Sequence, residues 1–371
     1  MKPHRARTGA VPAAMVLALI LAACGQAKLS GSHLDRNNAT PRKNQAVTIG
    51  LLLPSSQATR WQQFDRPLIQ RRVHKLCRDC KVRYVAGGAD AAAQQQQAQS
   101  LLSSGIDVLI IGSVDSRAAR PAVRQATAAQ VPVIAYDQLA EGPISGYVSF
   151  SGREVGRLQG RALLKALGPG ASRRSIVMLN GSPNDPNSSD FKDGSLSVLR
   201  GRVKIAKEYD VLNWSPAGAY TDMAAAISAL GPGRVDGVYA ANDGLAFGAI
   251  AALKAANVGP LPPVTGQDAD LDAVRRIITG EQYETVYKPF SREARAAADM
   301  AVALGRGRSI ADIATGTVSN SSLQDIPSVV LKPRSLTVAD IGIVIKDGMY
   351  TTDQICTHPF RSACAKAGLL G

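Results

Sequence analysis

The 371-residue sequence has little histidine, a residue on which many catalytic and metal sites depend. It contains only four histidines: His4, His33, His74 and His358. None of them follows a segment with the pattern of a strand, and the sequence has no nucleophile elbow, phosphate-binding glycine loop or His-Glu-x-x-His pair. Three carboxylates, Asp137, Asp185 and Asp268, could in principle supply a glycosidase pair. We nevertheless expect no enzyme, no metal site and no cofactor.

Aromatic residues are also scarce, at 5% of the sequence, although the net charge is +14. Nucleic-acid binding domains combine a concentrated basic surface with aromatic side chains or a recognisable module. Here the basic residues are spread over helix-like segments such as 71–75, 117–124 and 153–161, without aromatic residues between them. We therefore interpret the charge as an ordinary solvated cationic surface and expect no nucleic-acid partner.

No apolar run is long enough for a comfortable membrane span. The longest one near the start, residues 10–23, follows Lys2 and Arg5 and ends in Leu21-Ala22-Ala23-Cys24. Basic residues, a short apolar run and small residues before a cysteine are typical of a bacterial lipoprotein signal. We predict a signal peptide over 1–23, lipidation of Cys24, anchoring to the outer face of the cell membrane, and a flexible tether over 24–45. A plain signal peptide with an incidental cysteine is the alternative, and either implies export.

Four cysteines remain when Cys24 is set aside: Cys77, Cys80, Cys356 and Cys364. In an oxidising compartment an even number suggests two local disulfides, Cys77–Cys80 and Cys356–Cys364. The first pair closes a helical stretch, whereas a redox Cys-x-x-Cys normally opens one, so we expect a structural role. A four-cysteine zinc site would require the two pairs to meet in space.

From residue 47 onward, short apolar runs alternate with longer segments of helical periodicity. Repetition of this kind predicts an α/β fold with parallel, doubly wound sheets covered by helices on both faces. The strands are too many for one sheet and fall into two similar halves. We expect two lobes joined by a hinge of several strands with the ligand between them. The predicted parts are a first lobe (46–149 and 288–322), a second lobe (150–287 and 323–348) and a C-terminal extension (349–371).

Polar side chains follow the predicted strands, which in open α/β sheets is the edge where ligands bind. Asp268 follows a buried run, and Lys288 follows the next one. A carboxylate that only accepts and an ammonium that only donates suit a neutral ligand whose groups do both, such as a sugar. Other candidates lie at similar junctions or in loops: Arg60, Trp61, Asp137, Gln138, Asp185, Asn187, Trp214 and Asn242. For Asn184, Asp190 and Asp243 we favour helix capping.

Several short motifs carry a resemblance to a known family: Ile134-Ala135-Tyr136-Asp137, Gly181-Ser182-Pro183, Ala241-Asn242-Asp243, Gly266-Gln267-Asp268-Ala269-Asp270-Leu271 and Thr285-Val286-Tyr287-Lys288-Pro289. With them the chain resembles the periplasmic sugar-binding proteins of ABC importers, and most closely the D-xylose-binding branch of the type I two-lobe fold, over residues 47–348. The resemblance implies that a pyranose is hydrogen-bonded by Arg60, Asp137, Asp185, Asn187, Asn242, Asp268 and Lys288. It further implies that Trp214 stacks on the sugar ring, with Trp61 as a second candidate.

The most informative departure from the family's pattern lies beside Asp137, and a second is Ser151-Gly152, where the family often has Asp-Asn. Xylose binders usually follow Asp137 with arginine, whereas this chain has Gln138, an amide that both donates and accepts. The aldose therefore stays open between xylose and a related sugar.

We expect a monomeric, exported lipoprotein that captures a monosaccharide between its lobes and delivers it to a membrane permease of an ABC importer. The alternatives are a sugar receptor for a signalling or chemotaxis partner, and a binder of a different hexose.

Overall fold

The computed structural model describes residues 45–54, 58–87 and 90–370. The predicted signal peptide, Cys24 and the tether up to residue 44 lie outside these ranges. Within them, no helix combines the length and the apolar character that a membrane crossing requires.

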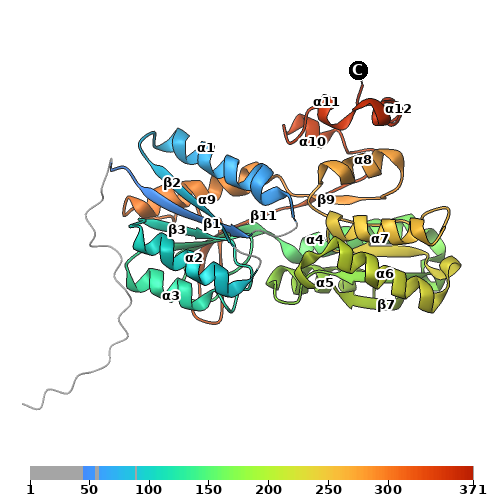
Figure 1. Ribbon diagram of the computed structural model, residues 1–371, viewed down its shortest axis with the longest axis horizontal. Coiled ribbons are helices and arrows are strands. Elements are labelled where there is room, and N and C mark those ends of the chain that lie inside the picture. The colour runs from blue at the N-terminus through green and yellow to red at the C-terminus, as the bar shows by residue number, and fades with distance from the viewer. Residues whose placement is uncertain (1–44, 55–57, 88–89, 371) are drawn as a thin grey trace, which may run out of the picture. The chain divides into compact units, whose positions relative to one another are not determined.

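The first lobe is built on a seven-stranded sheet in the order β10-β11-β5-β4-β3-β1-β2, in which only β10 runs antiparallel to its neighbour. Figure 1 labels β1, β2, β3 and β11 of this sheet. Its strands are β1 (Thr48–Pro54), β2 (Lys81–Gly87), β3 (Val108–Ile111), β4 (Val133–Tyr136), β5 (Gly146–Phe150), β10 (Gly316–Val318) and β11 (Ile326–Leu331). Every residue of β3, β4 and β5 is buried. Continuous apolar runs of this kind are expected where a parallel sheet is covered on both faces.

Helices cover both faces of this sheet. On one face lie η1 (Trp61–Asp65), a π-helix, with α1 (Arg66–Leu76) and α9 (Phe290–Gly305), and on the other lie α2 (Ala91–Ser103) and α3 (Arg120–Ala128). Successive residues of β1 face opposite ways, because Leu51 packs in the α1 and α9 core and Leu52 in the α2 and α3 core.

The second lobe has β6 (Ser175–Asn180) between β7 (Lys204–Asp210) and β8 (Gly237–Ala240), all parallel. Single bridges at Val238–Val264 and Gln267–Val286 lead from β8 towards β9 (Thr285–Tyr287), which pairs antiparallel with β12 (Arg334–Leu336). The helices of this lobe are α4 (Gly152–Leu167), α5 (Pro186–Leu199), α6 (Pro216–Leu230), α7 (Asp243–Ala255) and α8 (Leu271–Thr279), with the 3₁₀ turns η2 (Gly168–Arg173), η3 (Leu212–Trp214) and η4 (Pro232–Arg234).

The chain passes between the two lobes after β5, after β9 and after β11. We expected the second lobe to resume at residue 323, but β11 pairs with β5 in the first sheet, with Ser328 opposite Tyr147. The last crossing therefore follows Leu331. The strand pattern of β11 could not reveal this, because its partner β5 lies far away in the sequence.

The C-terminal segment, which we define as residues 341–370, contains α10 (Ile343–Lys346), α11 (Thr352–Ile355), η5 (His358–Phe360) and α12 (Arg361–Lys366), beside α8 in Figure 1. The structure joins Cys356 to Cys364 within it, and Cys77 to Cys80 between α1 and β2. Both pairs are those predicted, and the four-cysteine zinc site is excluded because each pair is bonded separately.

Candidate functional site

A cavity of about 230 Å³ lies between the two lobes. All ten residues that the sequence singled out for ligand binding line it: Arg60, Trp61, Asp137, Gln138, Asp185, Asn187, Trp214, Asn242, Asp268 and Lys288. They come from loops and from helical turns that follow strands of the two lobes, which explains why residues so far apart in sequence meet.

The two lobes touch each other beside this cavity. The Asn187 side-chain amide, from the second lobe, donates to the backbone oxygen and to the carboxylate of Asp137, each at 3.2 Å. On another side, the Thr59 hydroxyl donates to the Asp270 carboxylate at 3.3 Å. The structure is therefore in a closed arrangement.

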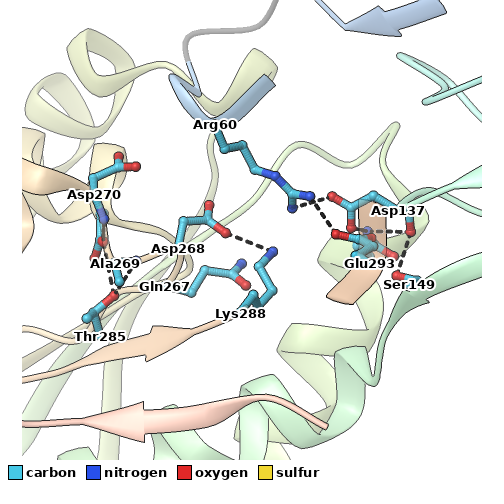
Figure 2. Close-up of polar contacts among 12 residues, drawn as sticks. Arg60, Asp137, Ser149, Gln267, Asp268, Ala269, Asp270, Thr285, Lys288 and Glu293 are labelled. Carbon is cyan, nitrogen blue, oxygen red and sulfur yellow. Dashed lines mark hydrogen bonds and ion pairs between the residues drawn. The ribbon is translucent and has the colours of Figure 1, made fainter. Parts of the chain in front are cut away.

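Arg60 is the most heavily paired side chain of the site. Its guanidinium is buried and donates to Asp65 through two nitrogens at 2.9 Å. It also donates to Asp137 at 2.6 Å and to Glu293 at 2.8 Å (Figure 2). Its Cζ also lies 4.2 Å from the ring centre of Phe290. Burial alone would lower the pKa of Arg60, but the three carboxylates outweigh it and raise that pKa well above its ordinary value. Arg60 therefore stays positively charged, and its three carboxylate partners hold the guanidinium in one orientation.

Two of these carboxylates, Asp65 and Glu293, were not predicted from the sequence. Glu293 lies in the first turn of α9, and Asp65 ends η1, where it also accepts from the Tyr136 hydroxyl. An acidic residue in the first turn of a helix is common on any surface, so its type and position carry no signal of a site. Burial raises the pKa of Glu293 well above its usual range, against the attraction of Arg60.

Asp268 and Lys288 form a buried ion pair, with Oδ1 and Nζ 2.8 Å apart (Figure 2). Burial by itself would lower the pKa of Lys288, but the attraction of Asp268 and Asp137 raises it. Each lobe holds one cavity aspartate in the left-handed backbone region, Asp268 at φ 93° and Asp137 at φ 64°. Non-glycine residues persist there only when surrounding contacts impose the conformation, and such residues cluster at functional sites.

Asp185 is the N-cap of α5, and its carboxylate links three parts of the site. Its carboxylate accepts from the backbone N–H of Asn187 at 2.9 Å, from the Trp214 indole N–H at 3.2 Å and from the side chain of Gln138. Burial, and then the nearby charge of Asp137, raise the pKa of Asp185 to about 7. This carboxyl group therefore changes its charge close to neutral pH.

Trp214 is held against Gly181 and beside Phe191. A Cβ placed on Gly181 would lie only 2.0 Å from Cη2 of the indole, and the Phe191 ring lies 6.2 Å away in an edge-on arrangement. The motif Gly181-Ser182-Pro183 thus needs glycine because the tryptophan ring occupies that space.

Two buried amide oxygens in the cavity wall, Oε1 of Gln138 and of Gln267, have no hydrogen-bond partner among the described residues. Gln267 is a further residue that the sequence did not single out, and its amide nitrogen donates to the Ala241 carbonyl at 2.8 Å. Buried acceptors are normally satisfied, so these oxygens suit hydroxyl donors of a ligand.

The capping role expected of Asp243 is wrong. Asn242 caps α7 by accepting from the Leu245 N–H at 2.8 Å, and Asp243 is the first helical residue. Its buried carboxylate accepts from the Asp270 N–H and the Thr285 hydroxyl, and so supports the Gly266–Asp270 loop from below. Composition cannot tell which of two adjacent polar residues is the cap.

The same correction applies at α5. Asp185 caps this helix, whereas Asn184 precedes the cap and Asp190 lies within the helix near Arg153, at 3.4 Å.

Taken together, the cavity offers two cations, several carboxylates, amides that donate and accept, and an indole ring. The cavity wall carries charges of both signs, with Arg60 and Lys288 beside three aspartates, so the arrangement suits a small neutral ligand rich in hydroxyl groups. The volume lies below the range of drug-sized pockets, which favours a single small molecule over an oligomer.

Residues 49–309 match the family described as periplasmic binding protein domain. The D-xylose-binding periplasmic protein of Escherichia coli is 32% identical over 316 residues, covering 83% of this chain and 92% of that protein. A multiple sugar-binding periplasmic receptor of Rhizobium radiobacter is 30% identical over 329 residues, with coverages of 83% and 92%. Among solved structures, an ABC transporter solute binding protein of Clostridium phytofermentans with bound β-D-glucose is similar, with a TM-score of 0.76, 25% identity and coverages of 83% and 99%.

Proposed function

Since the chain belongs to the periplasmic binding protein family and is a sugar-binding protein of ABC transport rather than an enzyme, we propose that it captures one neutral aldose in the cavity between its lobes. The observation that carries this proposal is the meeting of Arg60, Asp137, Asp268 and Lys288, from both lobes, around one small cavity. Sugar hydroxyls can donate to these carboxylates while accepting from these cations.

The energetics are sufficient for such a ligand. A hydrogen bond to a charged partner contributes about 1.5–3 kcal/mol, and micromolar affinity requires about 8 kcal/mol net. Several such bonds and one stacked ring meet this requirement after the cost of ordering the ligand. For the stacked ring we propose Trp214, with Trp61 as a second candidate, and for further hydrogen bonds Asp185, Asn187 and Asn242.

We propose xylose or a related aldopyranose as the ligand. Support comes from the relatives, of which one is named for D-xylose and another for multiple sugars, and from a structural neighbour with bound glucose. Gln138 bears on which aldose of this class binds. Its side-chain oxygen, which has no partner among the described residues, can accept from a ligand hydroxyl, whereas an arginine could only donate.

Calorimetric titration with a panel of pentoses, hexoses and the corresponding sugar acids tests the proposal. We expect micromolar or tighter binding of at least one neutral aldose, and binding at least tenfold weaker for the corresponding sugar acid. Absence of binding by every neutral aldose, at protein concentrations that would detect a millimolar Kd, would contradict it.

We further propose that Cys24 carries a lipid anchor on the outer face of the cell membrane and that the monomeric, closed, sugar-bound form docks on an ABC permease. The small residues before Cys24 and the family support this. Mass spectrometry of the exported chain should find an acylglyceryl group on Cys24 and none in the Cys24→Ser variant, and an unmodified Cys24 would contradict the anchor.

A further inference from the structure

The C-terminal segment contacts both lobes. It is fixed to the second lobe by an apolar core in which Val344 and Ile355 pack with Val274 and Ile277 of α8. Arg275 of α8 also donates to the Gln354 carbonyl at 2.6 Å.

Its contact with the first lobe is a row of three aromatic rings. The ring of Tyr350 meets Phe64 of η1 edge-on at 5.6 Å, and Phe64 lies 5.7 Å from Phe290. Phe290 in turn lies 4.2 Å from the guanidinium of Arg60. A buried side chain of the C-terminal segment, Tyr350, is therefore connected by direct packing to the cation of the cavity.

We propose that Tyr350 is a positioning residue of the sugar site, and that the C-terminal segment holds η1, with Arg60 and Trp61, in place against the second lobe. This inference rests on the proposed function, because it deepens the account of the same site. It also gives the disulfide between Cys356 and Cys364 a purpose, since the disulfide keeps the segment folded on α8.

The packing explains why η1 needs such support. It is a π-helix of five residues without a side-chain cap, and such short irregular turns gain their stability from tertiary contacts. Because the segment is attached to the second lobe while Phe64 belongs to the first, their contact also holds the lobes in the closed arrangement. Loss of the contact should therefore speed the release of the sugar more than it slows its entry.

The test is the Tyr350→Leu variant, compared with Tyr350→Phe and with Phe360→Leu. Phe360 serves as the matched control because it lies in the same segment but packs over Arg275 of the second lobe, 5.1 Å from its guanidinium. For Tyr350→Leu we expect Kd to rise about five- to twentyfold, mainly through faster dissociation in stopped-flow measurements. Tyr350→Phe keeps the ring and should stay within about twofold of the original chain, as should Phe360→Leu.

A double-mutant cycle separates positioning from general stability. If Tyr350 acts through Phe64, the Phe64→Leu and Phe64→Leu/Tyr350→Leu variants should bind the sugar with similar Kd values. Equal losses of affinity in Tyr350→Leu and Phe360→Leu, or a Tyr350→Leu variant with lower thermal stability and unchanged Kd, would overturn the inference.

Hydrogen exchange in the absence of sugar distinguishes this inference from the proposed function. The amides of residues 61–66 should exchange faster in Tyr350→Leu than in Phe360→Leu, whether or not any sugar binds. Unchanged exchange there refutes the positioning role, whereas failure of the original chain to bind any sugar refutes the proposed function alone.

Discussion

At the scale of the residue, the ion pair between Asp268 and Lys288 places two opposite charges side by side in the cavity wall. Both side chains are buried in the cavity wall, and Oδ1 of Asp268 lies 2.8 Å from Nζ of Lys288. Breaking a buried pair leaves one charge without compensation, which costs far more than breaking a pair at the surface. Truncation of either Asp268 or Lys288 should therefore have a large effect on sugar binding.

We predict that Lys288→Ala weakens sugar binding at least hundredfold, about 3 kcal/mol, because it removes a donor and leaves Asp268 unpaired. Calorimetry with the best sugar of the panel measures the change. Lys254→Ala is the matched control, because Lys254 pairs with Glu281 at 2.6 Å on the exposed surface. A similar affinity for the Lys288→Ala variant and the control would argue against the site.

Asp185 makes a prediction for stability against pH. Its pKa is raised to about 7 in the folded chain, so the folded state binds a proton that the unfolded state has already released. The contribution of Asp185 to stability is therefore complete below about pH 4 and is lost as the pH rises through 7. We expect the free energy of unfolding to fall more steeply between pH 5 and 8 in the original chain than in Asp185→Asn. Parallel curves from denaturant unfolding would contradict the raised pKa.

The sequence was informative for some residues of the site and silent for others. Asp268 and Lys288 each follow a short apolar run, and the edge of a parallel sheet brings such positions together. Glu293 and Asp65 lie in helices, where an acidic residue usually faces solvent, and only their burial against Arg60 distinguishes them. Pairing across the fold cannot be predicted from spacing.

At the scale of the element, the loop after β6 packs tightly against the ring of Trp214. The backbone of Gly181 lies so close to Trp214 that no other residue fits without a shift of the ring. The indole N–H of Trp214 also donates to Asp185, so a shift of the ring would disturb two of the proposed ligand contacts together.

We predict that Gly181→Ala raises Kd about ten- to hundredfold, because overpacking costs about 1–3 kcal/mol and the indole must move. Gly233→Ala is the control, since a Cβ at Gly233 meets no atom within 4 Å. The change in intrinsic tryptophan fluorescence on adding sugar should shrink in Gly181→Ala and persist in the control. A Gly181→Ala variant that binds like the original chain would show that the ring has no fixed role.

The elements themselves were predictable to different degrees. The parallel strands β3 and β4 were evident because they are short, apolar and flanked by helical periods. The π-helix η1 was not, because its residues also suit an ordinary α-helix, and the rings that contact its Phe64, Phe290 and Tyr350, come from distant parts of the chain. Local sequence determines the type of an element more reliably than its pairing or its distortion.

At the scale of the whole molecule, the charges of the cavity link the two lobes. Asp137 belongs to the first lobe and Asp185 to the second, and the charge of Asp137 is one of the two main causes of the raised pKa of Asp185. Closure without a ligand thus brings two carboxylates together at a buried place. Arg60 and Asn187 both donate to Asp137, yet burial and the charge of Asp137 still raise the pKa of Asp185, so this repulsion is only partly offset.

Under the proposed function, the hydroxyls of a bound sugar donate to both carboxylates and relieve the rest of this repulsion. A ligand that interacts more favourably with the closed form than with the open form shifts the balance between the two. We therefore predict that the sugar-free chain is mainly open at pH 8 and that its radius of gyration in X-ray scattering decreases when the sugar is added. In Asp185→Asn, which has lost one of the two charges, the sugar-free radius at pH 8 should already be smaller than that of the original chain. The original chain should approach the same smaller radius at pH 5, where Asp185, with its pKa of about 7, is protonated. If the sugar-free radius depends neither on pH nor on Asp185, the repulsion between the lobes does not control closure.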